Sequence, residues 1–315
     1  MVAQIDWAHL YLGTLGSLGL NLLRERDTMR FRQFIKWGKG KLSARKNEQY
    51  QISRRRHFEH SPLEIKAELN GECFVKIPAA RCRTSLFGFT LGKSPFVRTL
   101  SDYGRGACNR YQGSFLEHFY SACQPGTMAE VLALENERMQ EISAMATVMP
   151  WWTLTPEACL VMNAYDPDAV KLLSREAGKS GLDEKTNFGW QFSGPVSDEV
   201  GELEFERLSS VYDSIQKRGF LYKKTSAMHG EFLLNGDDWV WVNLGGKHRV
   251  SALAVLGEDQ IPVTVKCDYS PHYVQRDEVA TWFNVASGLF TQEEALKVFD
   301  AMLQGDQSTI LISVE

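Results

Sequence analysis

Residues 240–257 have the sequence VWVNLGGKHRVSALAVLG, in which a pair of glycines joins a strand pattern to a helix pattern. Residues 238–243 alternate in the manner of a strand, and Gly245 and Gly246 follow them. The next apolar positions are spaced for a short helix, which Gly257 would end. A strand, a glycine turn and a helix in this order predict a unit that mixes sheet and helix.

The turn between this strand and this helix is suited to bind an anion. Gly245 and Gly246 let the backbone approach a ligand closely. The first N–H groups of a helix have no partner inside it and point outward. His248 and Arg249 stand at the helix start and can add charge-assisted hydrogen bonds to phosphate oxygens. Lys247 can either reach a terminal phosphate or be a solvated lysine of the loop. The turn therefore predicts a phosphate-binding site.

The flanking sequence predicts further elements. Apolar residues at i, i+3, i+4 and i+7 predict an amphipathic helix over residues 199–218, ended by a glycine. Residues 232–234 predict a short strand, and a turn at residues 235–237 joins it to the strand before the glycine pair. Residues 261–265 predict another strand, and Pro262 suggests an edge position in the sheet.

The remaining elements are predicted more coarsely. Residues 73–77 predict a strand, and residues 128–149 predict a helix that stops before Pro150. Turn-forming residues place a boundary between about 150 and 190. Thr291 and Glu294 form a capping box for a last helix. Its apolar face would carry Ala295, Val298, Phe299 and Met302.

Together these elements predict an α/β or α+β fold in four parts. The parts are a basic amphipathic segment, a mixed N-terminal domain, a compact phosphate-binding domain and a C-terminal helical extension. Their boundaries are residues 1–47, 48–189, 190–270 and 271–315.

Composition narrows the class of protein. The chain has 315 residues, 43% hydrophobic and 23% charged, which is typical of a folded protein. A formal net charge of −4 gives no overall case for nucleic acid, so DNA is not an expected partner. Six scattered cysteines lack a C-x-x-C pair and predict reduced thiols in a cytoplasmic protein.

The N-terminal region differs from the rest in charge. Residues 10–23 carry no charge, and residues 24–56 hold 12 Lys/Arg against 3 Asp/Glu. Phe31, Phe34 and Ile35 have helical spacing among the basic residues. Two interpretations remain open, a basic helix on an anionic membrane surface through residues 10–47 and a helix that packs on its own protein.

The order of motifs after residue 196 resembles a known superfamily. Ser214-Ile215, Gly219, a strand, Asn235-Gly236-Asp237, Gly-Gly-x-His-Arg-x-x-Ala, Leu256-Gly257 and Ile261-Pro262-Val263 are similar to the ParB/sulfiredoxin superfamily over roughly residues 196–268. Members bind a nucleotide whose phosphates rest on this loop. The resemblance implies Gly246, His248 and Arg249 as phosphate contacts with Ser251 near them, and ATP or another nucleotide with Mg²⁺ as the ligand.

The sequence differs from members of the superfamily at several functional positions, and these differences limit which activities the resemblance implies. Sulfiredoxin has its catalytic cysteine where this chain has Lys247, so reduction of a sulfinic acid is not expected. The serine kinases of the superfamily have an Asp in place of Gly245. Residues 281–299 are a poor match to the helix-turn-helix of ParB. The context from Gly189 to Ser197 resembles uncharacterised bacterial proteins associated with surface-polysaccharide gene clusters, which suggests a saccharide or lipid-linked acceptor.

A phosphoryl transfer also needs a group that orients the acceptor hydroxyl, often a carboxylate. The serine kinases use an acid before or early in the helix that corresponds to residues 199–218, so Glu199, Glu202 and Glu204 are candidates beside Lys247. Glu204 shares the apolar face of that helix. Acids at a helix start also simply favour the helix dipole, which leaves a structural role open for each.

Two functions remain open on this basis. The first is a nucleotide-dependent phosphotransferase acting on a small-molecule or saccharide acceptor, in the cytoplasm or peripherally on the inner face of the membrane. The second is a nucleotide-binding switch or adaptor without group transfer, which docks to a membrane or a partner protein.

Overall fold

The fold is described from a computed structural model of the chain. It describes residues 62, 73–165, 192–220, 228–265 and 273–305. The chain divides into two compact units, Met1–Gln51 and Ile52–Glu315, and every described residue belongs to the second. The basic helix expected within residues 1–47 lies outside the described residues.

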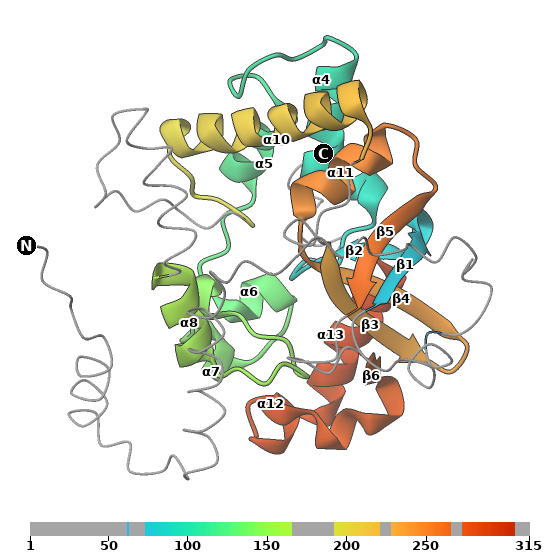
Figure 1. The fold of residues 1–315 in the computed structure, drawn as a ribbon. Helices are drawn as coiled ribbons and strands as arrows, with labels where there is room; N and C mark the ends of the chain where they lie inside the picture. The colour runs from blue at the N-terminus through green and yellow to red at the C-terminus, as the bar shows by residue number, and fades with distance from the viewer. Residues whose placement is uncertain (1–61, 63–72, 166–191, 221–227, 266–272, 306–315) are drawn as a thin grey trace, which may run out of the picture. The chain divides into compact units, whose positions relative to one another are not determined.

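The described residues form a mixed sheet, on the right in Figure 1. Its strands are β1 (Cys73–Pro78), β2 (Cys82–Thr84), β3 (His229–Asn235), β4 (Asp238–Gly245), β5 (Gln260–Val265) and β6 (Tyr273–Gln275). The order is β1-β5-β3-β4-β2, and β6 pairs with β3. β1 is antiparallel to β5 and β3 to β4, while the β2–β4, β3–β5 and β3–β6 pairs are parallel.

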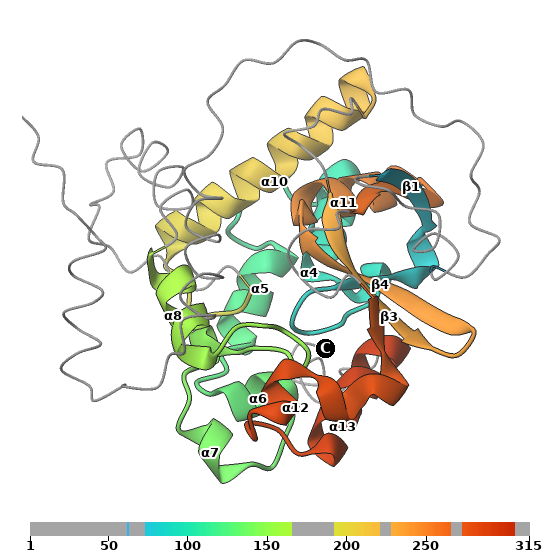
Figure 2. The same ribbon diagram turned by 60° about the horizontal axis from the view of Figure 1, so that its bottom comes forward.

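Helices cover both faces of this sheet, which makes the fold α/β. They are α4 (Pro95–Gly104), α5 (Phe115–Ala122), α6 (Met128–Leu132), α7 (Glu137–Gln140), α8 (Pro156–Tyr165), α10 (Asp198–Arg218), α11 (Lys247–Val255), α12 (Phe283–Ala286) and α13 (Gln292–Gln304), with 3₁₀ turns η1 (Ala79–Arg81), η2 (Leu91–Lys93), η3 (Ala144–Ala146) and η5 (Arg276–Thr281). In both views α12 and α13 lie at the opposite end from α10 (Figures 1 and 2).

Alternation along β3 and β4 explains why both faces are covered. On one face Phe232 and Trp241 pack with Val250 of α11. On the other face Leu233 and Val240 pack in the cluster that holds α13. Successive side chains of a strand point to opposite faces, so a central strand with two apolar faces needs a helical layer on each.

The expected divisions at residues 189/190 and 270/271 do not coincide with separate compact units. β1 and β2 come from the expected N-terminal domain, yet they pair with β5 and β4 of the expected phosphate-binding domain. One buried cluster runs from Leu86 to Leu303. The described residues therefore belong to one compact unit, Ile52–Glu315, with two buried apolar clusters.

The predicted helix over residues 128–149 is wrong. This segment forms α6, α7 and η3 instead. Ala133 takes the left-handed conformation, with φ of 52°, at the end of α6. Side chains of Asn136 and Ser143 then accept hydrogen bonds from the backbone N–H groups that open α7 and η3. Short polar side chains compete in this way for backbone groups, and here they outweigh the helix propensity of the Ala, Glu and Met residues.

The predicted edge position of β5 is also wrong, since β5 lies between β1 and β3. Pro262 is tolerated there because β3 pairs with β5 at Thr264, beyond the proline. The other predicted elements are confirmed as β1, β3, β4, α10, α11 and α13, including the capping box of Thr291 and Glu294. Among the described residues, no helix combines the length and the apolar character needed to cross a bilayer.

Candidate functional site

The glycine turn leads from the sheet into α11. β4 ends at Gly245, whose N–H donates to the side-chain oxygen of Asn243 at 3.1 Å. Gly246 is the N-cap of α11 and takes φ of +87°, a conformation that glycine adopts at little cost. Its carbonyl accepts from the N–H groups of Arg249 and Val250, which closes the first turn. The turn thus places Lys247 and His248 as the first two residues of the helix.

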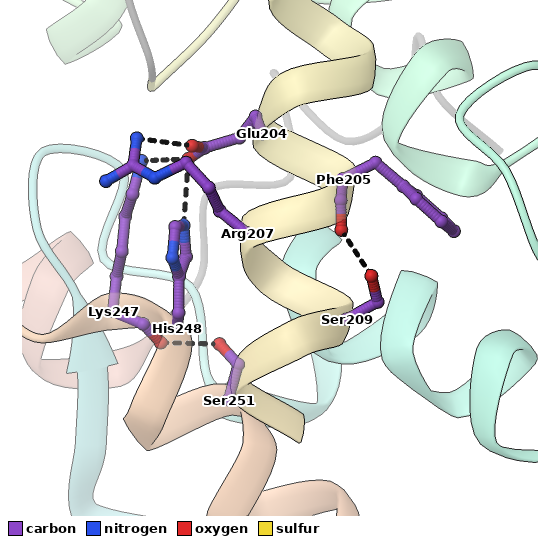
Figure 3. A network of polar contacts seen from close by, with 7 residues as sticks. All are labelled: Glu204, Phe205, Arg207, Ser209, Lys247, His248 and Ser251. Atoms are coloured by element: carbon purple, nitrogen blue, oxygen red, sulfur yellow. Dashed lines mark hydrogen bonds and ion pairs between the residues drawn. The ribbon is translucent and has the colours of Figure 1, made fainter. Parts of the chain in front are cut away.

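The side chains of Lys247 and His248 both run to one buried carboxylate on α10, that of Glu204 (Figure 3). Lys247 Nζ lies 2.8 Å and His248 Nε2 2.9 Å from the same oxygen, Glu204 Oε1. The other oxygen, Oε2, pairs with Arg207 Nη1 at 3.2 Å. Glu204 is only 4% exposed, so three basic side chains enclose one carboxylate away from solvent.

The electrostatics of this cluster keep Glu204 ionised. Burial alone would raise the pKa of Glu204, but Lys247, His248 and Arg207 hold that pKa well below its ordinary value. Burial lowers the pKa of His248, which favours the neutral imidazole. Burial also lowers the pKa of Lys247, although its contact with Glu204 opposes this.

Two aromatic rings fix the position of Lys247. Its ammonium lies 4.7 Å from the ring centroid of Phe96 on α4 and 5.3 Å from that of Phe192. The Phe96 ring also meets the His248 ring edge-on, with centroids 5.5 Å apart. Cation–π contacts of this kind contribute about 0.5–2 kcal/mol each. Lys247 is therefore held by its aromatic neighbours as well as by Glu204.

Arg249 lies over the glycine turn rather than in the cluster. A methyl group placed on Gly246 would come within 3.4 Å of the Arg249 guanidinium and within 2.9 Å of Met228. Arg249 is the residue that closes the first turn of α11, so its side chain stays near the N-terminal end of the helix. The contact of Arg249 with a phosphate stays a prediction.

Three of the predicted residues lie elsewhere. Ser251 is one turn further along α11, and its hydroxyl donates to the Lys247 carbonyl at 2.9 Å (Figure 3). Glu199 is exposed in the first turn of α10 and bonds with the N-cap residue Ser197. Burial raises the pKa of Tyr111 to about 12, and the charge of Glu202 contributes to this shift. The structure thus brings together Glu204, Lys247 and His248 but not the other two acids.

Sequence reasoning missed several residues of the site. Arg207 was detectable, because a residue three positions after Glu204 on a helix shares its side. Phe96 and Phe192 gave no signal, since only the tertiary fold brings them to Lys247. His229 was not missed, because its place just before residues 232–234 already suggested that it could lie near the phosphates if that strand is central, or be a structural histidine. Its imidazole lies against Gly245, which follows from the pairing of β3 with β4.

Comparison of the chain with family models, with curated proteins and with solved structures finds no match. Among the described residues, no group of three His, Cys, Asp or Glu side chains is placed to hold a metal ion. The function is therefore inferred from the chemistry of the cluster at the start of α11.

Proposed function

We propose that the chain binds the phosphate groups of ATP or another nucleotide at the start of α11 and transfers a phosphoryl group to a small-molecule or saccharide acceptor. One observation carries the proposal. Lys247, His248 and Arg207 gather around Glu204 at the first turn of a helix that follows a glycine turn. Helix N-termini and cationic side chains both stabilise phosphate charge.

Glu204 orients the phosphate-binding side chains in this proposal and does not act as the base. A base must take up a proton, and the lowered pKa of Glu204 opposes this. A buried Lys–Glu pair has a well-attested role in protein kinases, where the ion pair holds the lysine against the nucleotide phosphates. The pair of Lys247 and Glu204 has the same chemistry.

Magnesium would enter with the nucleotide. Mg²⁺ in such sites is held largely by phosphate oxygens and water, with one or two carboxylates from the protein. The described residues offer it no three-ligand cluster, so we assign it no protein ligand.

Binding is tested by thermal shift with ATP, ADP, CTP and GTP, each with and without magnesium, followed by calorimetry on the best ligand. A ligand that binds the native state raises the melting temperature by mass action. Transfer is tested by formation of the nucleoside diphosphate with glycerol, L-serine and D-glucose as acceptors. Absence of binding to all four nucleotides would refute the proposal.

Glu204 is held ionised by its basic partners and so does not act as the base for transfer. This favours a second candidate function, a nucleotide-binding switch without group transfer. In this case the cluster would sense the nucleotide, and the protein would dock to a membrane or a partner. Tight binding without turnover on any acceptor would favour the switch.

The proposal also includes a location for the protein, at the cytoplasmic surface of a membrane. The basic stretch of residues 24–56 would attract an anionic membrane surface from the cytoplasmic side. A saccharide or lipid-linked acceptor in surface-polysaccharide biosynthesis would be met at that surface.

A further inference from the structure

His229 lies against the glycine turn from the opposite strand. It is the first residue of β3, and its register partner in β4 is Gly245. A methyl group placed on Gly245 would be 2.1 Å from Cε1 of the His229 ring and 2.6 Å from Nε2. The imidazole therefore covers the Gly245 Cα, one residue before the N-cap of α11.

The contact with His229 accounts for glycine at position 245. Gly245 is not among the glycines with positive φ, so its backbone does not require glycine. The space for a side chain is filled instead by the His229 ring. Gly246 differs, because its φ of +87° does require glycine. The glycine pair thus serves two purposes, to make the turn and to admit an imidazole beside it.

We infer that His229 accepts the proton of the acceptor hydroxyl in the transfer reaction, an inference that rests on the proposed function. The His229 residue is exposed, so an acceptor can approach its ring from solvent. Imidazole ordinarily titrates near neutral pH, which suits a group that must take up and release a proton. A phosphate bound at Lys247 and Arg249 would lie beside the turn that His229 covers.

The reaction balances with these groups. The acceptor oxygen attacks the terminal phosphorus of a nucleoside triphosphate, and a new P–O bond forms. The bond between that phosphorus and the bridging oxygen breaks, and the nucleoside diphosphate leaves with the electron pair. The hydroxyl proton passes to a nitrogen of His229, which releases it to water after the product departs.

The other side chains near the turn that could accept a proton, Glu204 and His248, are less suited to do so. Glu204 is held ionised by its three basic partners, and its pKa is lowered. The His248 ring is fixed between Glu204 and Phe96 and is mostly buried. His229 is the imidazole near the turn that solvent reaches, among the residues that the structure describes.

The test compares wild type with His229→Gln, His229→Ala and a control, His118→Gln, which alters another exposed histidine on α5. Calorimetry with magnesium ATP measures binding. Formation of ADP with glycerol, L-serine, D-glucose or water as acceptor measures transfer. We expect the two His229 variants to bind ATP within about threefold of wild type and to lose about 10²–10⁴ in turnover. Added imidazole should restore part of the turnover of His229→Ala, and the control should match wild type.

The possible outcomes distinguish failure of the inference about His229 from failure of the proposed function. If wild type forms ADP and His229→Gln forms it equally fast, His229 is not the proton acceptor and the proposed function stands. If wild type binds ATP without forming ADP on any acceptor, the inference is overturned and the switch is favoured. If wild type binds no nucleotide, the proposed function fails and the inference fails with it. Lost turnover with intact binding and imidazole rescue supports both.

Discussion

At the scale of single residues, the two glycines of the turn make a testable contrast. Gly246→Ala forces a left-handed backbone on a residue with a Cβ, while Gly245→Ala drives a methyl group into the His229 ring. We expect Gly246→Ala to destabilise the protein by about 1–3 kcal/mol and Gly245→Ala by about 1 kcal/mol, because the exposed His229 ring can move aside. In a His229→Ala background, Gly245→Ala should cost less than about 0.5 kcal/mol, while Gly246→Ala should keep its full cost. Urea unfolding of the single and double variants measures how each glycine substitution depends on His229. If Gly245→Ala still destabilises the protein to the same extent in the His229→Ala background, the His229 ring is not the reason for glycine at position 245.

Arg249 tests the phosphate site directly. Loss of a hydrogen bond to a charged group costs roughly 1.5–3 kcal/mol, so Arg249→Ala should weaken nucleotide binding about 10- to 100-fold. Arg249→Lys should recover only part of the affinity, because an ammonium cannot reproduce the planar guanidinium. Calorimetry on the three proteins gives the affinities, and melting curves without ligand provide the control. Unchanged affinity in Arg249→Ala would remove Arg249 from the site, and an unfolded apo variant would make it a structural residue.

The pKa values of two buried glutamates, Glu204 and Glu231, are shifted in opposite directions. Glu204 has three basic partners and a lowered pKa. Glu231 on β3 is fully buried, and its Oε1 accepts from the indole N–H groups of Trp151 at 2.7 Å and Trp152 at 3.2 Å. No cation is among the causes of its shift, and burial raises the pKa of Glu231 to about 7. Neutral donors are thus not enough to hold a buried carboxylate in its charged form.

The raised pKa of Glu231 predicts a pH-dependent stability. Since the folded pKa lies above the unfolded one, the native state binds the proton more tightly. The stabilisation is fully present below about pH 4.5 and is lost as the pH rises to about 7. The shift corresponds to roughly 3 kcal/mol. Glu231→Gln cannot ionise, so the difference in unfolding free energy between the variant and wild type should change by this amount between pH 4.5 and 8. Urea unfolding at several pH values is the measurement, and a constant difference would show that Glu231 is not proton-linked.

At the scale of elements, Asn284 joins α12 to the turn that carries Trp151 and Trp152. Its side-chain amide donates to the carbonyls of Met149, Trp152 and Leu154 at 2.9–3.1 Å, and the residue is buried. Removal of the amide leaves buried carbonyl groups without their donor. The turn also presents the two indoles to Glu231, so the effect should extend to β3.

Asn284→Ala is therefore expected to lower the unfolding free energy by about 2–4 kcal/mol. Ser287→Ala, which alters an exposed hydroxyl at the end of the same helix, is the matched control and should cost less than about 0.5 kcal/mol. Denaturant unfolding of both variants measures the difference. Similar costs in the two variants would show that the amide contributes no more than a surface group.

The elements that sequence predicted correctly depend on residues close together in the chain. β3, β4 and α11 follow from alternation, a glycine turn and helical spacing, and α13 from its capping box. The interior position of β5 was not predictable, because its neighbour β1 comes from a distant part of the chain. The same limit applies to the site. Lys247, His248 and Glu204 were identified, but 44 positions separate His248 from Glu204, so their pairing and the lowered pKa were not foreseen.

At the scale of the whole molecule, the candidate site depends on distant parts of one unit. Lys247 receives Glu204 from α10 and Phe96 from α4, while His229 comes from β3. The sheet that carries the turn is completed by β1 and β2. All of these elements lie within Ile52–Glu315, so the described residues of the site belong to that unit. The other unit, Met1–Gln51, holds much of the basic charge that we associate with a membrane surface.

This division leads to a prediction for a chain that lacks residues 1–51. Such a chain should bind nucleotide within about twofold of the full-length protein, because every described residue of the site remains. It should lose association with anionic vesicles, since a basic residue near such a surface contributes about 1 kcal/mol. Co-sedimentation of both proteins with phosphatidylserine-containing vesicles and with neutral phosphatidylcholine vesicles, each at low and high salt, is the measurement.

The salt dependence and the neutral vesicles distinguish the causes. Full-length protein should sediment with anionic vesicles at low salt, and high salt should release it because screening shortens the range of charge attraction. Sedimentation with neutral vesicles to the same extent would mean that apolar residues, not basic ones, drive the association. Equal sedimentation of the two proteins would mean that residues 1–51 do not contact the membrane and that the basic segment has another role. Loss of nucleotide binding in the shorter chain would contradict the prediction that the described residues of Ile52–Glu315 are sufficient for binding.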